Sequence, residues 1–190
     1  MWIFDEIAVE EKPLGIPYFR EEPGSHSYVN LRKEPEKIDL LPELTDCPPL
    51  RELVTALNAP AGSFETYGCE KWIGAWANDA FPGYGFRKGS YVDVAFVNKE
   101  ACATEIPYRE LIEAFRQYAM VHRVYDLMHV GFELRWTVSA SAGWWTMSVW
   151  IYGIGRDEAD AKRWWRKAVG YFKNFLLTHD AAAFACNTAL

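Results

Sequence analysis

The fold is decided by the stretch 131–153, which reads GFELRWTVSASAGWWTMSVWIYG. Apolar and polar residues alternate on both sides of a short run of small residues, and this alternation is typical of a β-hairpin. A turn around Ser141 and Ala142 would bring the apolar residues of the two arms together on one face. The predicted pairs are Val138 with Trp145, Trp136 with Met147, Leu134 with Val149, and Phe132 with Ile151.

The second face of the predicted hairpin combines polar side chains with aromatic ones. The same register sets Arg135 beside Ser148, Thr137 beside Thr146, and Glu133 beside Trp150. Because side chains alternate with a period of two, a shift by one residue would mix the two faces and is disfavoured. This face is too polar for a core and too aromatic for an ordinary solvated surface. We therefore treat it as the first candidate for a functional surface.

The bulk composition indicates one globular domain with an appended arm. The chain has 190 residues, of which 50% are hydrophobic and 16% aromatic, so it can bury a substantial core. Its apolar runs are too short to span a membrane. The first residues lack the basic region and cleavage site of a signal peptide, so a cytoplasmic location is expected.

Cysteine usage and charge exclude several classes of function. Cys47, Cys69, Cys102 and Cys186 are widely spaced, which favours free thiols over disulfides and gives no zinc-like pattern. The net charge is −6, and the acidic surplus lies within residues 1–46. A balanced body argues against affinity based on phosphate neutralisation, so nucleic acid is an unlikely partner. No cofactor or metal is predicted.

Three parts of the chain differ in pattern. Residues 1–46 form an acidic, proline-rich arm expected to pack on the body, with an edge strand near residues 1–9. Residues 47–180 form the body, and residues 181–190 a frayed tail.

Within the body, apolar periodicity predicts helices near 48–58, 105–124 and 157–178, and strands near 63–69 and 91–97. Residues 74–90 are expected to form a loop whose aromatic residues pack on the body, and residues 120–130 fit either a helix or a strand. The predicted fold is α+β: a two-layer structure with a mainly antiparallel sheet of about four or five strands and helices packed on one face.

The second sheet face gives a candidate binding platform. Strand 91–97 matches the hairpin if Val92, Val94 and Phe96 face the core. The platform then consists of Tyr91, Asp93, Glu133, Arg135, Thr137, Trp144, Thr146, Ser148, Trp150 and Tyr152. Two carboxylates and an arginine could perform acid–base catalysis or orient a polar ligand, with the aromatic rings stacking on its flat part. The alternative is a solvated sheet with cross-strand ion pairs.

Cys69 is a second, separate candidate, because a cysteine beside glycine at a strand end can act as a nucleophile. It would need a base, and no pattern brings one of the four histidines near; the alternative is a small buried hydrophobic residue. The segment Leu50–Asn58, followed by Thr66-Tyr67-Gly68-Cys69, resembles the helix–turn–Thr-x-x-Cys opening of wybutosine-type tRNA-modifying proteins. The chain lacks the serine- and glycine-containing second half of that family, so no function follows from the resemblance.

Two further patterns have ordinary structural alternatives. His122, Asp126 and His129 would share one helix face only if the helix continued through all three. The last helix carries lysines and arginines on its outer side, which could contact nucleic acid if Trp144 or Trp150 lay on the same surface, or could simply face water.

The predicted function is that of a small binding or interaction protein, comparable in composition to bacterial accessory and immunity proteins, which engages another protein or a small polar or aromatic ligand. The alternatives are a small-molecule enzyme that uses Asp93, Glu133 and Arg135 or Cys69, and an RNA-binding module.

Overall fold

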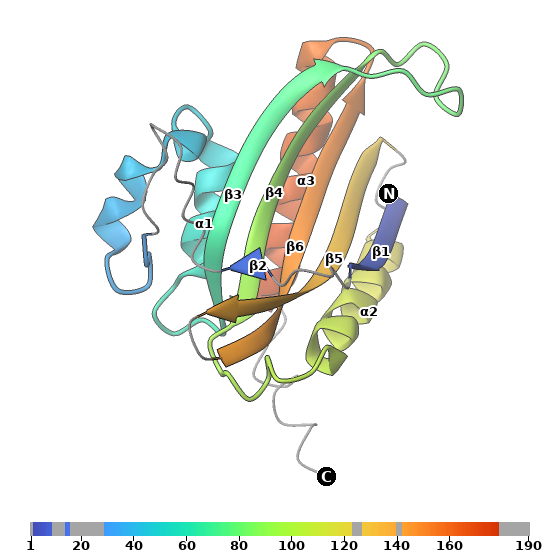
Figure 1. Cartoon of the computed structure of the whole chain (residues 1–190). Helices are drawn as coiled ribbons and strands as arrows, with labels where there is room; N and C mark the ends of the chain where they lie inside the picture. Colours follow the sequence, from blue (N-terminus) through green and yellow to red (C-terminus); the bar gives the residue numbers. More distant parts are fainter. Residues whose placement is uncertain (1, 9–13, 16–28, 123–126, 140–141, 179–190) are drawn as a thin grey trace.

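The computed structural model describes residues 2–8, 14–15, 29–122, 127–139 and 142–178 (Figure 1). Its strands are β1 (Trp2–Ala8), β2 (Leu14–Gly15), β3 (Phe64–Ala75), β4 (Phe86–Phe96), β5 (Met128–Ser139) and β6 (Ala142–Gly155). Its helices are the 3₁₀ helices η1 (Pro35–Leu40) and η2 (Pro42–Leu44), and the α-helices α1 (Pro48–Leu57), α2 (Ile106–Val121) and α3 (Glu158–Thr178). The predicted tail 181–190 lies outside the described residues.

All the described strands belong to one sheet of order β1-β5-β6-β4-β3, with β2 also beside β5. The four strands β5, β6, β4 and β3 are antiparallel, whereas β1 and β2 run parallel to β5. The helices pack on one face of this sheet, so the predicted α+β two-layer fold is confirmed (Figure 1). The edge strand expected near residues 1–9 is present as β1, but its parallel pairing with β5 was not predicted, because no sequence pattern ties residues 2–8 to that distant strand.

The three α-helices cover the apolar face through an aromatic core. Phe115 of α2 lies edge-on to Phe132 of β5 and to Phe172 and Phe175 of α3, with ring centroids 5.1–5.6 Å apart. These four rings are almost fully buried. Such contacts add to the burial of apolar area and join α2 and α3 to the sheet.

Helix α3 lies in close contact with β6 at Gly153 and Gly155. A Cβ atom built on Gly153 would lie 2.7 Å from the Cα atom of Trp165, and closer still to the backbone nitrogen of Trp165. Gly155 meets the backbone of Ala161 in the same way, at 2.8 Å from its Cα atom. The two glycines therefore allow the helix backbone to lie directly on the strand.

The predicted hairpin is present, but its predicted register is wrong by two residues. Trp136 lies opposite Trp145 rather than Met147, and the shift continues along the arms, so that Leu134 meets Met147 and Phe132 meets Val149. On the other face, Glu133 lies opposite Ser148 and Arg135 opposite Thr146. A two-residue shift leaves every side chain on its predicted face, so alternation alone cannot distinguish the two registers.

Gly143 fits the observed register, in which the turn lies one residue earlier than predicted. The pairing closes at Ser139 with Ala142, and Gly143 pairs with Val138. The indole of Trp136 lies over Gly143, where a Cβ atom would come within 2.5 Å of the ring. A glycine within the paired strands thus provides the space that the indole ring of Trp136 needs.

Strands β3 and β4 are much longer than predicted, so the predicted loop 74–90 was wrong at both ends. β3 continues to Ala75 and β4 begins at Phe86, which leaves a connection of residues 76–85. Several residues assigned to that loop are paired strand residues of β3 and β4. The ambiguous segment 120–130 is also settled where it is described: α2 ends at Val121 and β5 begins at Met128.

No helix within the described part of the chain is long and apolar enough to cross a membrane. Cys47, Cys69 and Cys102 are free thiols, as their spacing predicted, and Cys186 lies outside the described residues.

Candidate functional site

The sheet face opposite the helices brings together the residues predicted to form the platform. Antiparallel pairing aligns Asp93 of β4, Ser148 of β6 and Glu133 of β5 in one row across three strands. The next pair along β4 and β6 is Tyr91 with Trp150. Val92, Val94 and Phe96 are buried on the helix side, as the alternation of strand 91–97 predicted.

The polar centre of this face is buried rather than solvated. Asp93 is 4% exposed and Ser148 is 2% exposed, and the Ser148 hydroxyl donates a hydrogen bond to the Asp93 carboxylate. Thr137 is fully buried and donates to the carbonyl oxygen of Trp144 at 2.8 Å. Because buried polar groups need partners, these bonds stabilise the sheet and leave little of the centre for an external ligand.

The Glu133 carboxylate joins the polar centre to the aromatic residues. Its Oε2 atom accepts hydrogen bonds from Arg135 Nη2 at 2.6 Å and from Trp150 Nε1 at 3.0 Å. The side chains of Glu133 and Arg135 are 18% and 20% exposed, so this ion pair is largely shielded from solvent. The arrangement holds the indole of Trp150 in one orientation.

Two runs of aromatic rings, joined by Arg87, extend from Trp150 towards the loop end of the sheet. We call them together the aromatic ladder. Within each run, successive ring centroids lie 5.0–6.0 Å apart, and every member is partly exposed. In spatial order its members are Tyr91, Trp150, Trp72, Tyr152, Trp76, Phe81 and His129, with the Arg87 guanidinium between Tyr152 and Trp76.

Arg87 and Gly89 of β4 explain how the ladder is assembled. The guanidinium of Arg87 lies 4.8 Å from the ring centroid of Tyr152 and 5.9 Å from that of Trp76, distances typical of cation–π contacts. The Trp72 indole lies over Gly89, where a Cβ atom would come within 2.5 Å of the ring. Strand pairing therefore supplies both the spacing of the rings and the room for them.

Trp144 lies apart from the ladder, at the other end of the same face. Its ring centroid is 6.3 Å from that of Tyr67, and Lys99 Nζ lies 5.5 Å from the Trp144 ring. Lys99 also forms an ion pair with Glu65. The predicted platform is thus divided into an aromatic ladder, a buried polar centre and this smaller cluster.

The alternative catalytic site contains two carboxylates that already have protein partners. Asp93 accepts from Ser148, and Glu133 accepts from Arg135 and Trp150. One strand separates the two carboxylates, which places their Cα atoms about 10 Å apart. A general acid–base pair would have to exchange these hydrogen bonds for contacts with a substrate.

Cys69 lies away from this group, on the side of the sheet that faces the helices. It pairs with Val92 and packs against the core. Burial, followed by the nearby carboxylates of Glu43 and Asp93, raises the pKa of the Cys69 thiol to about 12. A nucleophilic cysteine requires a lowered pKa, so this environment favours the structural alternative over catalysis.

The same raised pKa predicts a loss of stability at alkaline pH. The unfolded thiol ionises near its ordinary pKa of 9.0, whereas the folded thiol keeps its proton up to about pH 12. Between these values the folded state binds more protons than the unfolded state, so the free energy of unfolding falls as pH rises, by up to about 1.4 kcal/mol per pH unit.

Urea unfolding at pH 8–11 under reducing conditions measures this effect. The Cys69→Ala variant should show a shallower decline than the wild type. Other buried groups titrate equally in both proteins, so an identical slope would show that Cys69 is not the group responsible.

The histidine cluster considered above does not form within the described residues. His122 caps the end of α2 and His129 belongs to β5, where it joins the aromatic ladder, so the two do not share one helix face. Asp126 lies outside the described residues. Among the residues that the structure describes, no group of three His, Cys, Asp or Glu side chains is arranged to hold a metal ion.

The basic outer side of α3 lies on the opposite side of the sheet from Trp150, because α3 packs on the apolar face. Lys162 pairs with Glu158, Arg163 with Asp160, and Lys173 with Glu52. The sequence favoured RNA binding only if this helix and a platform tryptophan shared a surface, and that condition is not met.

Sequence reasoning missed the part of the ladder contributed by β3, the 76–85 loop and His129. Trp72, Trp76 and Phe81 were expected to pack on the body of the protein, but no residue was predicted as their contact. Gly89 opposite Trp72 is the signal that could have revealed the continuation of the strands, because a glycine inside a strand often marks a close approach.

No protein-family model matches this chain, and no curated protein or solved structure matches it either.

Proposed function

We propose that the protein is a cytosolic, non-catalytic binding protein that engages a protein partner through the aromatic ladder. The observation that carries this proposal is the unbroken run of partly exposed tryptophan and tyrosine rings with Arg87 among them. Tryptophan, tyrosine and arginine are the residues that dominate the energetics of protein interfaces. Exposure of these rings to water costs free energy, and a partner that covers them would remove that cost.

The organisation of the ladder supports binding to a preformed surface. Trp150 is held by Glu133, and Trp72 is seated on Gly89, so the rings lose little rotamer freedom when a partner binds. The carboxylates of Asp93 and Glu133 are engaged within the protein, which favours a structural role for them over acid–base catalysis.

Native mass spectrometry of the protein purified gently from its own host tests the proposal. A stoichiometric protein partner is expected with the wild type. Trp150→Ala should weaken the complex by at least about thirtyfold, which corresponds to the cost of about 2 kcal/mol typical of a central interface residue. Arg87→Gln provides a second ladder variant that removes the cation without opening a large cavity.

Met120→Ala is the matched control, because Met120 is 80% exposed on α2 and remote from the ladder. It should keep the partner. A bare monomer, or a partner retained equally by both ladder variants, would contradict the proposal; circular dichroism establishes that each variant is folded.

Asp93→Asn separates the proposal from the enzyme alternative. The substituted side chain keeps an amide oxygen that can accept the Ser148 hydrogen bond, so partner binding should change by less than about threefold. If Asp93 instead acts as an acid or base, the same substitution should abolish turnover of a co-purified small molecule while leaving the fold intact.

A further inference from the structure

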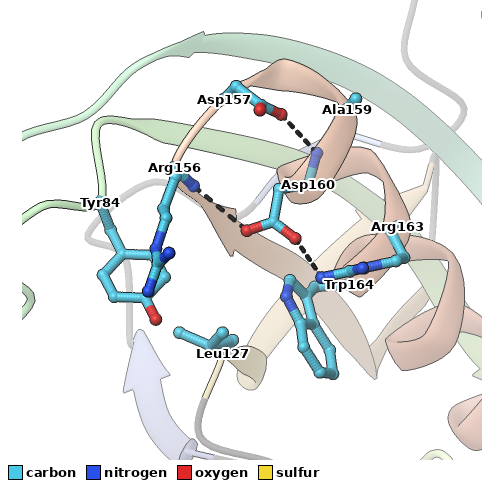
Figure 2. A pocket seen from close by; sticks show the side chains of 8 residues that line it. All are labelled: Tyr84, Leu127, Arg156, Asp157, Ala159, Asp160, Arg163 and Trp164. Atoms are coloured by element: carbon cyan, nitrogen blue, oxygen red, sulfur yellow. Dashed lines mark hydrogen bonds and ion pairs between the residues drawn. The ribbon is translucent and has the colours of Figure 1, made fainter.

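A cavity of about 630 Å³ lies where α3 begins and shares no lining residue with the aromatic ladder (Figure 2). Its volume is within the range of small-molecule sites. Its lining comes from the 76–85 loop, the residue before β5, and the first turns of α3 with the residues that lead into it. The lining residues are Tyr84, Leu127, Arg156, Asp157, Ala159, Asp160, Arg163 and Trp164.

The walls of the cavity combine aromatic rings with charged side chains. Figure 2 shows the rings of Tyr84 and Trp164 on opposite sides, with Leu127 between them. Tyr84 and Trp164 are both partly exposed. A ring on each side of the cavity suits a flat aromatic group.

The two carboxylates of the cavity are engaged within the protein. Asp157 Oδ1 accepts a hydrogen bond from the backbone nitrogen of Asp160 at 2.8 Å and so caps α3. The Asp160 carboxylate accepts from the backbone nitrogen of Arg156 at 3.3 Å and forms an ion pair with Arg163 (Figure 2). Neither carboxylate is therefore available as the main recognition group for a cation.

Arg156 differs from its neighbours, because no acceptor among the described residues contacts its guanidinium. The group is exposed at the rim of the cavity and lies 5.6 Å from the ring centroid of Tyr84, which limits its rotamers. A guanidinium presents a planar fork of N–H donors that matches a carboxylate or phosphate.

We propose that this cavity binds a planar aromatic ligand that carries one anionic group, with the flat part between Tyr84 and Trp164 and the anion on Arg156. A nucleoside monophosphate and an aromatic carboxylate share this chemistry. The site shares no residue with the aromatic ladder, although the 76–85 loop contributes to both.

Calorimetric titration of the full chain with four probes tests the proposal. Adenosine 5′-monophosphate and indole-3-acetate each carry a ring and an anion, adenosine lacks the anion, and inorganic phosphate lacks the ring. We expect at least one of the first two to bind with a dissociation constant below about 1 mM, and adenosine and phosphate to bind at least about tenfold more weakly. Which of the two binds identifies the phosphate or the carboxylate as the anion recognised.

Variants locate the site. Arg156→Gln and Tyr84→Ala should each weaken the binding at least about tenfold, whereas Arg166→Gln, an exposed change on the same helix that does not line the cavity, should leave it unchanged. The indole N–H resonance of Trp164, assigned with Trp164→Phe, should shift on titration. Absence of binding, equal binding of phosphate alone, or full affinity in Arg156→Gln would overturn the proposal.

Discussion

Replacement of Gly153 by alanine is expected to lower the free energy of unfolding by about 3 kcal/mol or more. The added Cβ atom would lie 2.7 Å from Trp165 Cα and closer to the backbone of Ala161 and Trp165. These are backbone atoms of a long helix, so they cannot move aside as the tip of a flexible side chain would. Helix α3 would have to separate from β6, and its buried residues Trp165, Ala168 and Phe172 would lose contacts.

Gly170→Ala is the matched control for this prediction, since Gly170 lies on α3, the helix that packs against Gly153, and a Cβ atom there would meet nothing within 4 Å. Alanine is the better helix former, so this variant should be more stable than the wild type by up to about 1 kcal/mol. Urea unfolding followed by circular dichroism measures both. A Gly153→Ala variant within 1 kcal/mol of the wild type would show that the approach of α3 to the strand is not tight.

Replacement of Arg32 by alanine is expected to lower the free energy of unfolding by about 2–4 kcal/mol. Its Nη1 atom donates to the carbonyl oxygens of Ala59, Gly62 and Phe64 at 2.8–3.0 Å, and Nη2 donates to that of Pro60 at 2.7 Å. A single charged side chain thus holds the whole connection between α1 and β3. Hydrogen bonds to charged groups are stronger than neutral ones, and alanine would leave these carbonyls to find water.

Arg32→Lys and Lys33→Ala complete the experiment. Lysine keeps the charge but cannot reach four carbonyls with a planar fork, so it should recover less than half of the loss. Lys33 is exposed and adjacent, and its removal should change stability by less than about 0.5 kcal/mol. Equal stability of Arg32→Ala and Lys33→Ala in urea unfolding would contradict the structural role of Arg32.

Local patterns were sufficient to predict the elements of the body and the side on which residues lie. Alternation assigned Phe132, Leu134 and Val92 to the apolar face and Asp93 and Glu133 to the other, because a strand has a period of two. The helical stripe of residues 157–178 likewise identified the buried side of α3, including Trp165 and Phe172.

The same alternation could not determine which residues lie opposite one another. The hairpin register differs by two residues from the prediction, since such a shift preserves both faces, and the observed register places the Trp136 ring over Gly143. The parallel pairing of β1 with β5 joins residues more than a hundred positions apart, for which a single sequence contains no local signal.

The candidate site shows this division most clearly. The chain by itself determined that Trp150, Tyr152 and Tyr91 share a face with Asp93, since that follows from backbone geometry within each strand. Only the tertiary structure decided that the polar centre is buried, that Trp72 and Trp76 extend the ladder, and that Arg156 faces a cavity. The reason is physical: a strand's period sets the direction of each side chain, whereas its neighbours and its burial depend on contacts between segments distant in sequence.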